Sequence, residues 1–133
     1  MANTLTNGSA TITLPDDLMW TDEFTWQPVE QSERYTIAGA LIVQAASKLA
    51  GRTITLEGGR NFGWMQRGDV LTLQSWRAQP GLQMTLAFRG EAPRTVVFDH
   101  KRTSLEAPLV PANEYSDPIN TDWCIPTIRL LEV

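Results

Sequence analysis

Cysteine and histidine are almost absent from this sequence of 133 residues, which contains only Cys124 and His100. One cysteine excludes a disulfide framework, and one cysteine with one histidine cannot supply the three or four ligands of a zinc site. The 11 lysines and arginines are outnumbered by 15 acidic residues, so no basic excess is available to neutralise nucleic-acid phosphates. We therefore expect no metal, no cofactor and no sequence-specific nucleic acid among its ligands.

A long apolar run is also missing. The longest, residues 38–43, falls far short of the about 20 residues that a membrane-spanning helix needs. Residues 1–9 are polar and lack the basic and apolar regions of a secretory signal. These features predict a chain that is made and folded in a cytosol and does not insert into a membrane.

The residues that are present fit one globular domain. Hydrophobic residues make up 42% of the chain and charged residues 20%, which is enough apolar material for a core. A chain of this length normally forms one domain. We expect a single domain over residues 1–133, with a flexible N-terminus at residues 1–9. Residues 108–126 contain four prolines and predict an ordered but irregular connection.

Alternation of apolar and polar residues with a period of two predicts most of the strands. Gly39 and the adjacent Gly58 and Gly59 mark turns between them. Residues 45–50 are short of strand formers and favour a helical turn or a loop. The expected strands are residues 10–14, 34–38, 40–44, 52–56, 82–88, 95–98 and 127–133.

Residues 69–78 predict a single short helix. Asp69 is a suitable N-cap because its carboxylate can accept from the free amides of the first turn. Trp76 is expected to bury against a sheet, and Pro80 and Gly81 end the helix. The fold class is therefore mainly β, a sandwich or small barrel with one short α-helix.

Residues 15–29, here called the aromatic segment, predict an irregular arm. Pro15 and Pro28 keep this segment out of a central strand. Its apolar side chains either fold back on their own sheet or dock on a neighbouring chain. Aromatic side chains often dominate such contacts. The candidate subunit-interface residues are Trp20, Phe24 and Trp26.

Residues that could carry chemistry are few. His100 lies at a polar strand end and no serine stands in a nucleophile turn, so a Ser-His-Asp triad is not expected. Cys124 is expected in the core. The carboxylate pairs at residues 16–17 and 22–23 lack the spacing of a calcium loop and favour turns. Residues 58–63 are rich in glycine but lack the lysine of a phosphate-binding loop. We expect no catalytic residue and no enzyme.

The order of the segments is informative as a set. It runs from residues 12–26 through 39–43 and 50–56 to the short helix, and on to 86–89 and 127–133. In this order the chain resembles the small tail and baseplate proteins of long-tailed bacteriophages, and most nearly the ripcord-type baseplate protein of contractile tails and R-type pyocins. It is also similar in architecture to tail-tube subunits. None of the segments is a catalytic signature, so the family carries no active-site residue over to this chain.

The resemblance implies a tail-tube-like β-sandwich or small barrel that serves as a structural virion protein. Such a protein forms a symmetric ring, expected to be a hexamer, at the baseplate or tube end, where it joins tube, sheath and hub components. Its partners are then other copies of itself and neighbouring tail-tube, sheath or baseplate proteins. Assembly takes place in the cytoplasm of the host bacterium, and the protein ends in the virion.

Two other functions stay open. A carbohydrate-binding β-sandwich would use exposed members of the five tryptophans, and it predicts a coplanar tryptophan platform on a monomer. A small hydrolase predicts two carboxylates that face each other across a cleft. The ring protein instead predicts aromatic side chains in subunit contacts. A mass measurement or negative-stain images separate the three.

Overall fold

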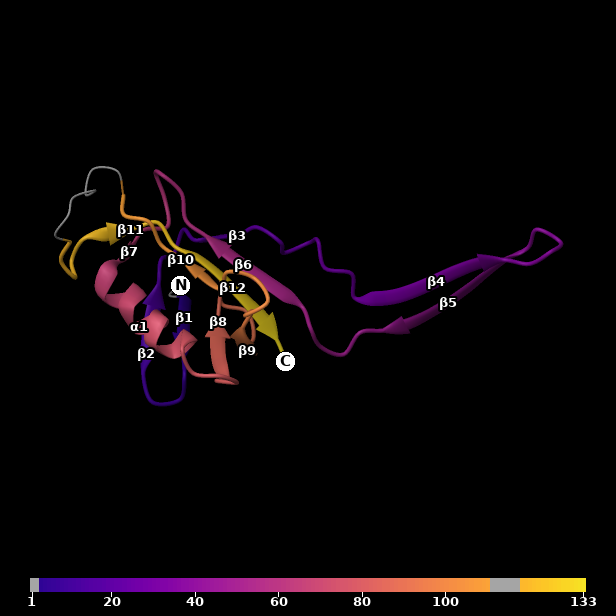
Figure 1. Cartoon of the computed structure of the whole chain (residues 1–133), viewed down its shortest axis with the longest axis horizontal. Coiled ribbons are helices and arrows are strands. Elements are labelled where there is room, and N and C mark those ends of the chain that lie inside the picture. Colours follow the sequence, from indigo (N-terminus) through magenta and orange to yellow (C-terminus); the bar gives the residue numbers. More distant parts are fainter. Residues whose placement is uncertain (1–2, 111–117) are drawn as a thin grey trace.

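An antiparallel sheet of eight strands forms the body of the chain (Figure 1). The structure is a computed structural model that describes residues 3–110 and 118–133. The strands of this sheet are β1 (Asn3–Thr6), β2 (Thr11–Leu14), β3 (Met19–Trp20), β6 (Thr53–Glu57), β8 (Met84–Ala87), β9 (Arg94–Phe98), β10 (Leu105–Glu106) and β12 (Thr127–Glu132). Neighbouring strands follow the order β2-β1-β8-β9-β12-β6-β3, and β10 pairs with β12.

Two further strand pairs lie outside this sheet. β7 (Met65–Gln66) pairs with β11 (Trp123–Cys124), and β4 (Val29–Tyr35) pairs with β5 (Leu41–Ser47). One helix, α1 (Arg67–Arg77), occurs in the described part of the chain. The protein is therefore mainly β with one short helix, as the sequence predicted.

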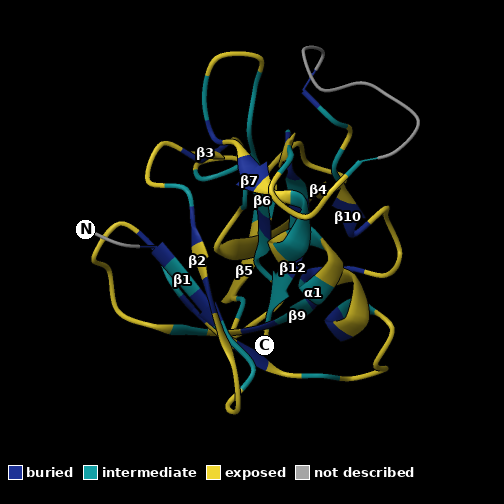
Figure 2. Cartoon of the chain, turned by 90° about the vertical axis from the view of Figure 1, so that its left-hand side faces the viewer, coloured by how far each residue is buried: buried dark blue, intermediate teal, exposed yellow. Residues whose placement is uncertain are grey.

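The core is built from the alternate residues that point inward from the strands. Ile54 and Leu56 of β6 are fully buried, and their cross-strand partners Leu130 and Ile128 are buried with them. Trp76 of α1 closes the same cluster from the helix side, as predicted. Figure 2 shows the resulting alternation of buried and exposed stretches along the strands. A period of two therefore positions this core, because successive strand residues point to opposite faces.

The start of α1 differs from the prediction. The helix follows Gln66, whose side chain makes no capping hydrogen bond, and Asp69 lies within the first turn and is not the N-cap. The first two N–H groups of the helix donate instead to the carbonyls of Asp122 and Asn120, at 2.8 and 3.0 Å. These carbonyls come from a segment more than 40 residues away along the sequence. A distant backbone segment therefore satisfies amides that a local side chain was expected to cap.

The expectation of a flexible N-terminus over residues 1–9 is wrong for β1. This strand lies between β2 and β8, and Leu5 is fully buried between Ile12 and Leu86 on those strands. The sequence of β1 contains one apolar residue among three polar ones. Four residues with this pattern are too few to predict a strand from the sequence. In the structure, pairing with β2 on one side and β8 on the other stabilises β1.

Asn3 fixes the first strand to two loops. Its Nδ2 donates to the carbonyl of Pro15 at 3.1 Å and its Oδ1 accepts from the backbone N–H of Arg89 at 2.9 Å. Asn3 itself is 2% exposed, and Asn3→Ala removes the hydrogen-bond partner of the Pro15 carbonyl and of the Arg89 N–H. We expect the free energy of unfolding to fall by about 1–3 kcal/mol in urea titrations. Asn61→Ala, at an exposed position, is the control and should change it by less than about 0.5 kcal/mol. Equal effects of the two substitutions would contradict this role of Asn3.

The region after residue 28 also differs from the prediction. β4 begins at Val29, before the strand predicted for residues 34–38, and β5 runs on to Ser47. The prediction of a helical turn or loop over residues 45–50 is therefore wrong for residues 45–47. Seven cross-strand pairs with β4 outweigh the low strand propensity of alanine. In the proline-rich connection, residues 111–117 lie outside the described residues.

Candidate assembly surface

β4 and β5 form a hairpin that projects from the body of the chain (Figure 1). We call residues 29–47 the projecting hairpin. The chain reverses at Gly39, whose φ of 86° is the left-handed conformation that favours glycine. Every strand residue of the hairpin is exposed except Ile42, which is half-buried. No hairpin residue belongs to the hydrophobic core cluster of the described residues.

The two faces of the projecting hairpin differ in polarity. Cross-strand partners share a face, so the pairing of Tyr35 with Leu41 and of Glu33 with Val43 sets the alternation. The more apolar face carries Val29, Gln31, Glu33, Tyr35, Leu41, Val43, Ala45 and Ser47. The opposite, polar face carries Glu30, Ser32, Arg34, Ile42, Gln44 and Ala46. Ile37, at the tip, is fully exposed as well. The hairpin thus presents an apolar strip that the body does not cover.

The edges of the projecting hairpin are free within the described part of the chain, because β4 and β5 pair only with each other. An isolated two-stranded hairpin is at best marginally stable in water. Free edges also expose rows of unpaired N–H and C=O groups that can pair with another chain. An apolar strip together with two free edges makes this hairpin the strongest candidate for a surface that binds a partner.

Stacked aromatic and cationic side chains hold the base of the hairpin. The backbone N–H of Lys48 donates to the carbonyl of Pro28 at 2.9 Å, which closes the two ends of the hairpin. The Lys48 amine lies 5.7 Å from the centre of the Trp26 ring. The Arg52 guanidinium lies 4.6 Å from the Trp20 ring and 5.9 Å from the Trp26 ring. These cation–π contacts link the base of the hairpin to the core.

The structure separates the three residues predicted for the interface. Trp20 is 5% exposed and lies in the core, where its ring meets Phe88 edge-on at 5.9 Å. Trp26 is half-buried beside Lys48, and Phe24 is 89% exposed. Phe24 therefore keeps a free surface for a partner, whereas Trp20 contributes its surface to its own domain.

The aromatic segment as a whole is not a free arm. Its residues Met19 and Trp20 form β3, which pairs with β6, and Leu18 is buried. The Asp22 carboxylate accepts from the indole Nε1 of Trp20 at 2.9 Å and from the backbone N–H of Thr55 at 2.8 Å. Asp22 thus serves a structural role in joining the segment to β6.

The other residues considered for chemistry lie apart from one another. His100 is exposed in the turn after β9, and its ring lies 6.2 Å from that of Phe98. Cys124 is buried, as predicted, and burial raises the pKa of its thiol. Among the described residues, no group of three or more His, Cys, Asp or Glu side chains has a metal-binding arrangement. No helix in those residues is long and apolar enough to cross a membrane.

The glycine-rich residues 58–63 form a tight turn between β6 and β7. Gly59 and Phe62 make an isolated antiparallel bridge, and Gly63 has a φ of 69°. A Cβ on Gly58 would lie 2.6 Å from the Gly63 carbonyl oxygen, so the two backbones approach too closely for a side chain. The glycines therefore serve the turn, as the sequence predicted.

Comparisons with family models, with curated proteins and with solved structures gave no match. For the projecting hairpin, the sequence predicted strands at residues 34–38 and 40–44, but it did not predict that they project from the body. The best local signal is the run Glu-Gln-Ser-Glu-Arg at residues 30–34, which places polar residues on both faces of a strand. A strand with that pattern is poorly suited to a domain core.

Proposed function

We propose that this chain is a structural subunit of a bacteriophage tail that assembles into a symmetric ring through its projecting hairpin. The observation that carries this proposal is the hairpin itself, whose apolar strip and two edges lie outside the body. A second copy of the chain supplies strands of matching length for those edges. Burial of the strip against another copy then stabilises a hairpin that is marginal alone.

Head-to-tail contact explains how one hairpin makes a ring. The free edge of β5 in one copy meets the free edge of β4 in the next, so the same heterologous contact repeats by rotation until it closes. The polar face of the hairpin, with Glu30, Ser32, Arg34 and Gln44, then lines the water-filled centre. The more apolar face packs against neighbouring subunits. Both faces acquire an environment that suits their composition.

The resemblance to baseplate and tail-tube proteins supports the rest of this function. It supports a ring, proposed to be a hexamer, at the baseplate or tube end of the tail, between tube, sheath and hub components. The subunit then acts by its shape and contacts in the virion and not as an enzyme. The partners are copies of this chain and the adjoining tail proteins.

The oligomeric state of the purified chain tests this proposal. We expect sedimentation velocity at micromolar concentration to give a closed oligomer, and negative-stain images to show rings with a central opening. A monomer that stays monomeric up to high micromolar concentration would contradict the proposal. A monomer that also binds a neutral oligosaccharide would favour the carbohydrate-binding function instead.

A further inference from the structure

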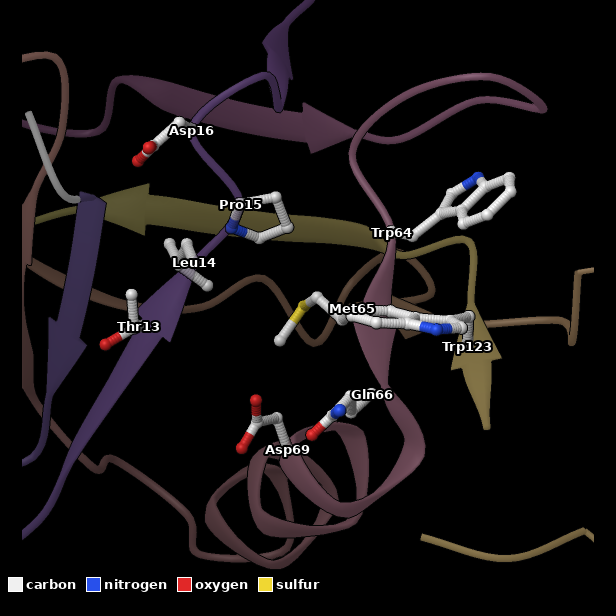
Figure 3. A pocket seen from close by; sticks show the side chains of 9 residues that line it. All are labelled: Thr13, Leu14, Pro15, Asp16, Trp64, Met65, Gln66, Asp69 and Trp123. Carbon is white, nitrogen blue, oxygen red and sulfur yellow. The ribbon is translucent and has the colours of Figure 1, made fainter. Parts of the chain in front are cut away.

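Charged and aromatic side chains lie near each other at two ends of the body. At the end away from the projecting hairpin, Trp64 and Trp123 line two surface hollows with volumes of about 290 and 270 Å³. In the first, Asp16 and Asp69 lie apart from each other and from both rings (Figure 3). In the same view the Trp123 ring is edge-on while the Trp64 ring faces the viewer, so the two do not form the coplanar platform expected of a carbohydrate-binding module. At the base of the projecting hairpin, in contrast, cations and indoles are stacked on one another.

Two segments join the projecting hairpin to the body (Figure 1). The segment before β4 ends at Pro28, which is hydrogen-bonded to Lys48 across the base. On the other side, the backbone N–H of Gly51 donates to the carbonyl of Glu132 at 2.8 Å, so β12 fixes the chain from Gly51 onward. Leu49, between these two points, is 98% exposed, so its side chain does not tie the segment to the body. Rotation within this segment would therefore swing the hairpin unless other contacts fix its direction.

Five side chains at the hairpin base supply such contacts, and we call them the cation–π ladder. Cations and indoles alternate in it, in the order Lys48, Trp26, Arg52, Trp20 and Arg94. The Arg52 guanidinium lies between the two indoles, at 5.9 Å from the Trp26 ring and 4.6 Å from the Trp20 ring. The Arg94 guanidinium, on β9, lies 5.2 Å from the Trp20 ring. The ladder thus runs continuously from the end of the hairpin to the sheet of the body.

Arg52 joins the two halves of the ladder. Its backbone carbonyl accepts from the N–H of Glu132 at 2.8 Å, and its Nη2 donates to the carbonyl of Glu23 at 2.7 Å. Its Nε is buried and has no acceptor among the described residues, so stacking on the indoles is a main contact of this end of the guanidinium. A planar guanidinium presents two faces, which lets it stack on two rings at once. Trp20 belongs to the core cluster and Trp26 does not, so Arg52 couples the hairpin side to the core.

We propose that Arg52 is a positioning residue that holds the projecting hairpin in one orientation relative to the body. The core fixes Trp20, Arg52 stacks on it, and Trp26 with Lys48 follows on the hairpin side. Without the guanidinium, only the segment around Leu49 directs the hairpin. The consequence for assembly rests on the proposed ring function. A hairpin whose direction is fixed presents its edges to the next copy with a smaller loss of conformational entropy.

Distances between two spin labels test the orientation of the hairpin directly. One label is placed at Ala38→Cys in the hairpin turn and the other at Lys101→Cys in the turn after β9, both exposed positions, in a chain that also carries Cys124→Ala. A large excess of unlabelled chain keeps one labelled copy in each oligomer. We expect pulsed dipolar spectroscopy to give one narrow distance distribution for this chain and a distribution about twofold wider when Arg52→Met is added.

Replacement of Trp26 separates the cation–π contact from apolar bulk. Trp26→Phe keeps an aromatic face and should keep the narrow distribution, whereas Trp26→Leu should widen it as Arg52→Met does. The matched control is Arg60→Met, which removes the same charge at an exposed position outside the ladder and should leave the distribution unchanged. Sedimentation of the unlabelled variants then gives the concentration at which the oligomer forms, which should rise about tenfold for Arg52→Met.

A distribution in Arg52→Met as narrow as in the parent chain would overturn the proposal, whatever the oligomeric state. Equal widening by Trp26→Phe and Trp26→Leu would also overturn it, because the size of the indole would then matter and its cation–π contact would not. If Arg52→Met fails to fold in thermal unfolding, Trp26→Leu decides the question, since Trp26 lies outside the core cluster. A parent chain that is monomeric but has a narrow distribution would contradict the ring function and support the role of Arg52, so the two failures are distinguishable.

Discussion

Removal of the projecting hairpin is expected to abolish ring assembly and to leave the body folded. The backbone hydrogen bond between Lys48 and Pro28 shows that the ends of the hairpin are adjacent, so an Asn-Gly turn can replace residues 29–47. No residue of the hairpin belongs to the core cluster. The deletion therefore removes none of the buried residues against which the core side chains pack. The midpoint of thermal unfolding should therefore shift by only a few degrees. The sedimentation coefficient of the deletion variant should be that of a monomer.

A pair of point substitutions tests the same surface without deletion. Val43→Glu puts a charge on the more apolar face, and Gln44→Glu puts the same charge on the polar face one residue away. We expect Val43→Glu to dissociate the oligomer and Gln44→Glu to leave it closed, because only the first buries an unpaired charge in the proposed contact. Rings of normal yield from the deletion variant, or from Val43→Glu, would place the subunit contact elsewhere on the chain.

Trp20→Ala is expected to cause the largest loss of stability of any substitution in the aromatic segment. The side chain lies in the core against Phe88, donates to Asp22 and lies under the Arg52 guanidinium. Truncation of a buried aromatic residue costs about 3–5 kcal/mol, and loss of the hydrogen bond from the indole to Asp22 adds to that cost. Urea unfolding of the purified variant measures the change in the free energy of unfolding.

Phe24→Ala is the matched comparison in the same segment. Phe24 is 89% exposed, so its truncation should change the stability by less than about 0.5 kcal/mol. If Phe24 belongs to a subunit contact, as the sequence suggested, the variant should instead weaken assembly in sedimentation at low micromolar concentration. A stable Trp20→Ala variant would show that the indole contributes little to the core, and the packing described here would then be wrong.

Local patterns in the sequence determined the class of fold and much of the core. Alternation in β6 and β12 identified strands whose inward residues, such as Ile54 and Leu130, pair across the sheet. Trp76 in the helix and Cys124 in the core were also predictable, because burial of apolar side chains at a regular period depends on neighbours along the chain. The glycine-rich turn after β6 belongs to the same group.

Tertiary structure alone decided which apolar residues stay outside. Leu41 and Val43 would suit a buried strand, yet both are exposed on the projecting hairpin. Trp20 and Phe24 are similar in sequence context, yet one is buried and the other is exposed. Trp64 and Trp123 line the same surface hollows only because β7 pairs with β11. Exposure depends on which distant segments pack together, and a local sequence pattern records how a segment folds but not what finally covers it.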